Sequence, residues 1–499
     1  MNIKRAKEEI KDSIEAYLAK DDLGNYEIPR IRQRPILLLG APGIGKTQIM
    51  EQIAKECGIG LVSYTITHHT RQSAIGLPFI SQKEYGGKSY SVTEYTMSEI
   101  VASVYDKMEQ TGLTEGILFI DEINCVSETL APAMLQFLQC KTFGCHEIPN
   151  GWIIVAAGNP PEYNKSVREF DVVTMDRVKK MDVEPDFSVW KEYAWKEQVH
   201  PAVISYLSLR TKYFYQMETT VDGRIFATPR GWEDLSTLIK TYEKLGKPVD
   251  YDVVVQYIQH PKAAKDFAAY LELYRKYRED YQIEEILLGK DSTLMQKKAA
   301  HASFDERLSI VSLLISGCSQ EFRTVGEKEA VLELLYPVLK RFKEQMDREN
   351  WAEIFEQETD NVRQEYEEKK QAELLSRAEE RTYRQAGQIL EQMKQVLKAG
   401  TWENAEAVFE KIRELFGKEK AEYETAYDKA GSVLEHVFDF LEAAFEAGQE
   451  MVWFITELNS GFYSVQFLQE YACERYQRYN RELLFDQGRQ KILERIQAL

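Results

Sequence analysis

Between residues 35 and 185, short apolar runs alternate with stretches in which apolar residues recur at helical spacing. This alternation is typical of the doubly wound α/β class, in which helices cover both faces of a parallel sheet. Residues 77–95 interrupt the alternation with the pattern of an inserted hairpin that turns at Gly86-Gly87, and residues 97–109 then predict a helix. The runs that predict strands of the sheet are residues 36–39, 61–66, 117–120 and 152–157.

Beyond residue 186 the strand pattern fades and helical periodicity replaces it. Residues 189–212 and 231–245 show this periodicity first, and almost everything from about 250 to 499 follows it, with few prolines and many charges. Breaks between helices are expected near Gly289, Gly317, Gly400, Gly417 and Gly461. The aromatic residues expected inside a helical bundle are Trp351, Trp402, Phe409, Phe438 and Trp453.

Composition and charge narrow the function classes. Hydrophobic residues make up 44% of the 499 residues, which is enough for packed cores and argues against global disorder. The net charge of −18 argues against a broad surface for nucleic acid or anionic membrane, although a local basic pore is compatible with it. Scattered cysteines, a charged N-terminus unlike a signal peptide and the lack of a long apolar run lead us to expect a soluble cytoplasmic protein.

Residues 40–47, GAPGIGKT, match the pattern G-x-x-x-x-G-K-[ST] in full. They follow an apolar run and precede a helical stretch, and this strand–loop–helix context distinguishes a P-loop from a chance match. Glycines let backbone N–H groups surround phosphates, and the helix N-terminus adds its positive dipole end. Lys46 is expected to reach the β- and γ-phosphates and Thr47 to coordinate Mg²⁺. The residues of this segment expected to bind a nucleotide are Gly40, Pro42, Gly43, Ile44, Gly45, Lys46, Thr47 and Gln48.

An acidic pair follows the third apolar run. Residues 116–124 read GILFIDEIN, so Asp121 and Glu122 lie at the carboxyl end of a strand, where open α/β sheets bind their ligands. We expect Asp121 to bind the nucleotide through the Mg²⁺ shell that it shares with Thr47, and Glu122 to polarise the attacking water. Two solvated acids at the end of a strand are the simpler alternative, and the P-loop upstream argues against it.

The fourth apolar run ends in residues 158–161, GNPP. A polar side chain at this point, beside Asp121 and Glu122, has the position to sense the γ-phosphate and orient water, which makes Asn159 a candidate catalytic residue. Asn-Pro is also a strong turn signal, so a role for Asn159 in the turn alone agrees equally well with the local sequence.

The order of these motifs resembles that of AAA+ ATPases. GAPGIGKT, LFIDEIN and AAGNP are followed by the segments Met175-Asp176-Arg177-Val178 and Ala227-Thr228-Pro229-Arg230-Gly231. Over about residues 1–280 the chain is similar to the MoxR group in particular. In that group an Asp-Glu-Ile-Asn sequence, a Ser/Thr-Pro-Arg before a lid helix and an insertion within helix 2, which residues 77–95 resemble, are typical.

The resemblance implies roles for three residues. Asn159 would be the sensor 1 residue, Arg177 the arginine finger donated to the nucleotide of the next subunit, and Arg230 the sensor 2 residue that reaches the nucleotide of its own subunit. Val178 stands where the family usually has Phe, and the nearby Arg168 could share or take the finger role. Surface ion pairing is the simpler alternative for Arg177 and Arg230.

With the resemblance, the chain divides into four parts. Residues 1–34 are an N-terminal helix and connector, 35–185 the AAA+ nucleotide-binding α/β core, 186–280 a helical lid, and 281–499 an all-α region that includes an extended arm and a bundle. The implied function is ATP hydrolysis with Mg²⁺ that drives remodelling or chaperone-like maturation of another protein, by a homo-oligomer in the form of a hexameric ring.

The implied partner is a protein, either a client or a protein with a von Willebrand factor A domain, and the choice of ATP over GTP also rests on the resemblance. Two alternatives from other classes are a nucleotide-gated assembly scaffold with little turnover and a nucleic-acid-directed AAA+ motor. Intact Lys46, Glu122 and Asn159 argue against the scaffold, and the net charge of −18 argues against the motor.

Overall fold

The computed structural model describes residues 1–68, 74, 76–127, 130–143, 146–163, 170–221, 223–345, 350–402 and 404–483, with only the backbone of His68. The chain divides into two compact units. Met1–Val189 with Gln364–Arg377 form the first, which we name the core unit, and Trp190–Arg363 with Ala378–Leu499 form the second, the helical unit. The four-part division of the sequence, with boundaries at residues 34, 185 and 280, stays a prediction.

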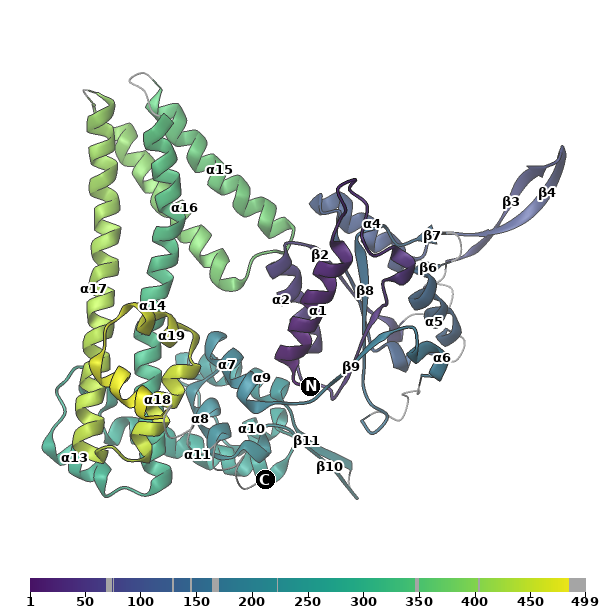
Figure 1. Ribbon diagram of the computed structural model, residues 1–499. Coiled ribbons are helices and arrows are strands. Elements are labelled where there is room, and N and C mark those ends of the chain that lie inside the picture. Colours follow the sequence, from purple (N-terminus) through teal and green to yellow (C-terminus); the bar gives the residue numbers. More distant parts are fainter. Residues whose placement is uncertain are drawn as a thin grey trace. The chain divides into compact units, whose positions relative to one another are not determined.

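A parallel sheet organises the core unit. Among the described residues, its five strands lie in the order β2-β5-β8-β1-β9, which confirms the predicted α/β class. Figure 1 labels β2, β8 and β9 of this sheet. Four of them coincide with the predicted apolar runs, but β9 was not predicted because Lys179, Lys180 and Asp182 obscure its buried residues Met181 and Val183. The strands are β1 (Ile36–Gly40), β2 (Gly60–Thr65), β5 (Gly116–Asp121), β8 (Trp152–Gly158) and β9 (Lys179–Val183).

Helices cover both faces of this sheet. Figure 1 shows α1 and α2 on one face and α4 and α5 on the other, where apolar residues of α4 and α5 pack against Leu118, Ile120 and Ile154. The central strands β5 and β8 are therefore buried on both sides, as their continuous apolar sequences require. The helices of the core unit are α1 (Ile3–Leu18), α2 (Lys46–Cys57), α4 (Glu99–Thr111), α5 (Ala131–Cys140) and α6 (Val172–Met175).

Two hairpins accompany the sheet. The predicted insertion forms β3 (Pro78–Tyr85) and β4 (Lys88–Tyr95), joined by Gly86 and Gly87 at φ 58° and 78°, and Figure 1 shows this hairpin extending away from the sheet. Positive φ at both turn positions is what a two-residue hairpin loop of type I′ requires, and glycine supplies it. A second hairpin, β6 (Thr142–Phe143) and β7 (His146–Glu147), was not predicted.

The helical unit begins with a set of short helices and one hairpin. Residues 189–212 were predicted to be helical, and the structure divides them between α7 and α8, because Gln198 takes φ 59° and Pro201 starts a new helix. The hairpin of β10 and β11 was not predicted. The elements are α7 (Phe187–Lys196), α8 (Pro201–Leu209), β10 (Gln216–Thr220), β11 (Gly223–Ala227), α9 (Pro229–Lys244), α10 (Tyr251–Tyr257) and α11 (Pro261–Asp280).

Long helices make up the rest of this unit, and α14 and α17 run side by side (Figure 1). The breaks expected near Gly289, Gly400 and Gly461 are confirmed, but those at Gly317 and Gly417 are wrong, since these glycines lie inside α14 and α17. The elements are α12 (Ile283–Leu287), α13 (Thr293–Ala300), α14 (Phe304–Gln345), α15 (Trp351–Gln371), α16 (Arg377–Ala399), α17 (Ala405–Phe445), α18 (Gln449–Ser460) and α19 (Phe462–Glu470). The end of α15, from Gln364, and the first residue of α16 belong to the core unit.

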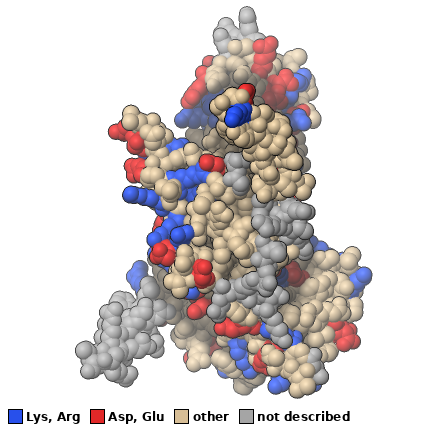
Figure 2. All heavy atoms as spheres, turned by 90° about the vertical axis from the view of Figure 1, so that its right-hand side faces the viewer, with Lys and Arg blue, Asp and Glu red and all other residues tan. Residues whose placement is uncertain are grey.

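The aromatic residues predicted inside the bundle are buried to different degrees. Phe438 is fully buried, and Trp351 and Trp402 pack at the margin of an apolar cluster formed by α14 to α17. Phe409 and Trp453 are partly buried. Within the described part of the chain, no helix has the length and apolar character needed to cross a bilayer. Figure 2 shows Lys and Arg side chains interspersed with Asp and Glu on the face that it presents.

Candidate active site

The strand order brings three predicted parts of the site to one edge of the sheet, the edge at the carboxyl ends of its strands. β8 lies between β5 and β1 and pairs with both in parallel. The carboxyl ends of the three strands therefore place Asn159, Asp121 and the loop after Gly40 next to one another. Residues distant in the chain meet here because of topology, and the site is built from that edge.

The loop between β1 and α2 has the backbone of a phosphate-binding loop. Gly43 and Gly45 take φ 77° and 94°, in the left-handed region that favours glycine, and Lys46 begins α2 directly after Gly45. Gly40 is required by space, since a Cβ there would lie 2.6 Å from Val183 O. Pro42 and Ile44 complete the loop, and its open N-terminal helix end can hold an anion.

Lys46 is the most enclosed charged residue of this site, with 7% of its surface exposed. Its Nζ donates hydrogen bonds to Gly40 O at 2.7 Å, Ala41 O at 2.9 Å and Asn159 Oδ1 at 3.0 Å. A buried ammonium needs such acceptors because burial removes its water. The charge of Lys46 is thus fixed between the P-loop and the end of β8.

Thr47 and Asp121 form a pair of oxygen ligands. Thr47 Oγ1 donates a hydrogen bond to Asp121 Oδ2 at 3.1 Å, which joins the start of α2 to the end of β5. A hydroxyl and a carboxylate are hard oxygen donors of the kind that Mg²⁺ prefers, so these residues fit the predicted Mg²⁺ ion. Gln48, the next residue of α2, is exposed.

Glu122 has an unusual backbone conformation. Its φ and ψ of 56° and 34° lie in the left-handed region, and its N–H donates to Asp121 Oδ1 at 2.9 Å. A non-glycine residue rarely adopts this conformation, and such residues gather at functional sites. The carboxylate of Glu122 is half-buried, and with the described residues it forms no hydrogen bond or ion pair. It is therefore available to a water molecule or a ligand.

Asn124 contacts the site although its sequence pattern had suggested no role for it. Its Nδ2 donates to Asn159 O at 2.8 Å, its Oδ1 accepts from Asn159 N at 3.3 Å, and its side chain is 5% exposed. The signal available in the sequence was its position in the Asp-Glu-Ile-Asn segment. The pairing with Asn159 depends on the strand order, which no local pattern reveals.

Arg177 lies on the surface two residues after the end of α6. Its guanidinium donates a hydrogen bond to Gln139 Oε1 of α5. Hydrogen bonds from Thr174 hold the pKa of Asp171 below its usual range, and the charge of Arg177 contributes. The neighbouring Val178, which departs from the family pattern, is 5% exposed and packs in the apolar core. Arg168, the alternative finger, lies outside the described residues.

Arg230 is exposed in the first turn of α9. Thr228 caps this helix, since its Oγ1 accepts a hydrogen bond from Gly231 N at 3.2 Å, and Pro229 follows at the first helical position. Arg230 belongs to the helical unit, whereas the P-loop belongs to the core unit. The role of Arg230 as sensor 2 therefore stays a prediction.

The family comparison agrees with this geometry. Residues 36–174 match the family model described as ATPase family associated with various cellular activities (AAA). The chain carries an AAA ATPase-family domain. The match begins with β1 and ends in α6, so it includes Lys46, Asp121, Glu122 and Asn159. This family in general binds a nucleotide, usually with Mg²⁺, and has ATPase activity.

Other comparisons add little to the AAA domain. No curated protein matches the chain. Among solved structures, a point mutant of Thermotoga maritima RuvB is similar at 16% identity and a TM-score of 0.28, over 52% of this chain and 69% of that chain.

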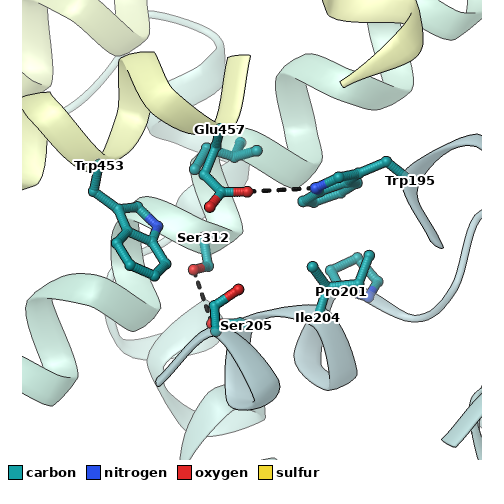
Figure 3. Close-up of a pocket in the computed structure, with 9 residues that line it drawn as sticks. Trp195, Pro201, Ile204, Ser205, Ser312, Trp453 and Glu457 are labelled. Atoms are coloured by element: carbon teal, nitrogen blue, oxygen red, sulfur yellow. Dashed lines mark hydrogen bonds between the residues drawn. The ribbon is translucent and has the colours of Figure 1, made fainter. Parts of the chain in front are cut away.

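A cavity in the helical unit is lined by residues other than the predicted site residues (Figure 3). Trp195 Nε1 donates to the buried carboxylate of Glu457 at 3.4 Å, and Lys191 forms an ion pair with the same carboxylate. The volume open to the centre of a water molecule is about 10 Å³, which is room for about one water. A nucleotide does not fit there.

Proposed function

We propose that this AAA domain hydrolyses ATP with Mg²⁺ as part of a MoxR-like ATPase that remodels or matures another protein. The observation that carries the proposal is the arrangement of Lys46, Glu122 and Asn159 at one sheet edge. Lys46 and Asn159 are joined by a hydrogen bond of 3.0 Å, and the carboxylate of Glu122 lies at the end of the neighbouring strand. A scaffold that only binds nucleotide needs no such carboxylate.

The proposed mechanism assigns one task to each side chain. Lys46 holds the β- and γ-phosphates, and Thr47 and Asp121 hold Mg²⁺, which when bound offsets the negative charge of the phosphates. Glu122 accepts a proton from the water that attacks the γ-phosphorus, while the bond from that phosphorus to the bridging oxygen breaks and ADP leaves. Asn159 orients that water by a hydrogen bond.

A surface beside Arg177 supports the proposal that the chain acts as a homo-oligomer. Val172 and Val173 of α6 are 84% and 57% exposed, and Arg177 follows them within the same short segment. Apolar side chains beside an exposed guanidinium suit a contact in which a second copy receives the arginine at its nucleotide. The hexameric ring itself is proposed from the resemblance to MoxR-like ATPases.

The hairpin of β3 and β4 supports the proposal that the partner is a protein. Phe79, Ile80, Tyr85 and Tyr90 are each at least 45% exposed on it. Aromatic side chains, which three of these four residues carry, are enriched at the centres of protein interfaces. A client protein, or a partner with a von Willebrand factor A domain, is proposed to meet the chain there.

The test compares ATP turnover of the wild type with that of Glu122→Gln. The variant keeps the side-chain shape but cannot accept the proton, so we expect it to bind ATP and to hydrolyse it at least about a hundredfold more slowly. Near-normal turnover of Glu122→Gln would show that Glu122 is not the general base. A wild type that does not hydrolyse ATP would favour the alternative of a nucleotide-gated assembly scaffold.

Isolation of ATP-loaded Glu122→Gln from the native host, with Lys46→Ala as the matched control, identifies the partner. A salt-dependent DNA titration tests the motor alternative.

A further inference from the structure

We propose that Asn124 is a positioning residue for ATP hydrolysis, which fixes the backbone of Asn159 so that the Asn159 side chain faces Lys46 and the γ-phosphate. This inference rests on the proposed function and adds a residue to it.

The side-chain amide of Asn124 forms the hydrogen bonds that a neighbouring strand would otherwise form with the backbone of Asn159. Pairing of β8 with β5 ends at Ala156 and pairing with β1 ends at Gly158, so Asn159 lies beyond the last paired residues of the sheet. Its N–H and C=O would otherwise lose their partners at a half-buried position. Asn124 supplies an acceptor to the N–H and a donor to the C=O, at 3.3 and 2.8 Å, and so extends the order of the sheet by one residue.

Gly158 provides the space for this contact. A Cβ at residue 158 would lie 2.6 Å from Asn124 Oδ1 and 2.8 Å from its Cγ. The glycine is therefore needed for the close approach of the amide. The two bonds and the lack of room together leave the amide of Asn124 one orientation.

The same short turn carries Asn124 and the proposed base. Asn124 lies in the 3₁₀ turn Ile123–Cys125, and Cys125 N donates to Glu122 O at 2.8 Å. Asn124 thus connects the turn after β5 with the end of β8, and the Asn159–Lys46 bond continues this connection to the P-loop. Reacting groups misplaced by about 1 Å can lose about a hundredfold in rate, so a fixed spacing here matters for turnover.

A double-mutant cycle tests whether Asn124 acts through Asn159. Steady-state kcat and KM for ATP are measured for the wild type, Asn124→Ala, Asn159→Ala and the double variant. We expect Asn124→Ala to lower kcat by at least about tenfold while KM changes by less than about threefold. The double variant should have a kcat within about threefold of Asn159→Ala alone. The proposal would be overturned if the fold-loss of kcat in the double variant equals the product of the two single losses. An unchanged kcat in Asn124→Ala would also overturn it.

Two other variants allow the proposal to be tested even if Asn124→Ala does not fold. Asn124→Asp keeps the shape and the acceptor but cannot donate to Asn159 O, and Gly158→Ala forces the amide away, so both should lower kcat in the same way. If either folds and turns over ATP at the wild-type rate, the proposal is wrong. Ile123→Val is the matched control, because it trims a buried apolar side chain of the same turn and should leave kcat unchanged.

The outcomes separate this proposal from the proposed function. A wild type that does not hydrolyse ATP would overturn both. Normal turnover in the wild type, together with loss in Glu122→Gln and none in Asn124→Ala, would overturn the role of Asn124 alone.

Discussion

Lys46 Nζ donates a hydrogen bond to Asn159 Oδ1 at 3.0 Å, although the two residues lie 113 positions apart in the chain. The bond joins the P-loop after β1 to the end of the neighbouring strand β8. It also explains why one charged side chain is 7% exposed at an edge that must remain open to a ligand. The phosphates of a bound nucleotide are expected to meet an ammonium whose position is already fixed.

Lys46→Ala should abolish useful nucleotide binding. Removal of one partner of a desolvated, hydrogen-bonded charge pair costs about 2 kcal/mol or more, which corresponds to at least about thirtyfold in Kd. Titration with a fluorescent ATP analogue measures this. Lys55→Ala, which changes a lysine in the last turn of the same helix, should bind like the wild type. Equal affinities for Lys46→Ala and the wild type would contradict the assignment.

The sheet and the P-loop could be predicted because their signals are local. Continuous apolar runs mark β5 and β8, which are buried on both faces, and the glycines of residues 40–47 mark a loop that needs positive φ. β9 was not predicted because a charged residue such as Lys179 suggests a solvated position, whereas Lys179 contacts another part of the core unit. Its Nζ donates to Ser13 Oγ of α1 at 2.7 Å, a contact that only the folded core unit creates.

The structural roles of the glycines in the long helices, by contrast, could not be predicted from local sequence. Gly400 and Gly461 lie at helix ends, whereas Gly317 lies inside α14, where a Cβ would meet Leu287 Cδ1 at 2.4 Å. A glycine that ends a helix and one that admits a neighbouring helix look the same in sequence. The pairing of Asn124 with Asn159 is hidden for the same reason, since it depends on which strands are neighbours.

ATP should promote oligomers through the surface that carries Val172. With ATP and Mg²⁺, Glu122→Gln should reach a mass near six times the 58.0 kDa chain in light scattering. Val172→Asp in that background should reduce the mass toward that of one chain, because a charge placed in an apolar contact is not solvated. Leu294→Asp, which changes another exposed apolar residue, is the control. A monomer under all conditions would contradict both the ring and the role of Arg177.

Lys141 predicts a pH dependence of stability. Burial, together with the nearby charge of Arg30, lowers the pKa of Lys141 from 10.5 to about 8. Between these two values the unfolded chain binds a proton that the folded chain does not, so the free energy of unfolding should rise with pH. Relative to Lys141→Met, the wild type should gain about 3 kcal/mol across this window.

Chemical denaturation of the wild type and Lys141→Met, from about pH 7 to about pH 11, measures the gain. The methionine also removes the hydrogen bond to Gln33 Oε1 at 3.1 Å, which shifts the difference at every pH but not its slope. A difference that stays constant or falls as the pH rises would show that Lys141 is not forced toward its neutral form.

Arg177→Ala should bind ATP nearly as well as the wild type and lose most of its turnover. A finger arginine stabilises charge on the transferred phosphoryl group, which is worth about a thousandfold or more in rate. If it acts in the neighbouring subunit, a mixture of Arg177→Ala and Lys46→Ala should recover part of the activity. At some interfaces of mixed oligomers, a Lys46→Ala subunit would supply its arginine to a subunit that still binds ATP.

Arg168→Ala is the control that decides between the two candidate fingers. It should reduce turnover less than Arg177→Ala, because the hydrogen bond to Gln139 fixes Arg177 on the surface beside the exposed valines of α6. Greater damage from Arg168→Ala would transfer the finger role to that residue. No recovery in demonstrably mixed oligomers would show that Arg177 does not act across an interface. Val178 would not explain such a failure, since its side chain packs in the apolar core of its own subunit.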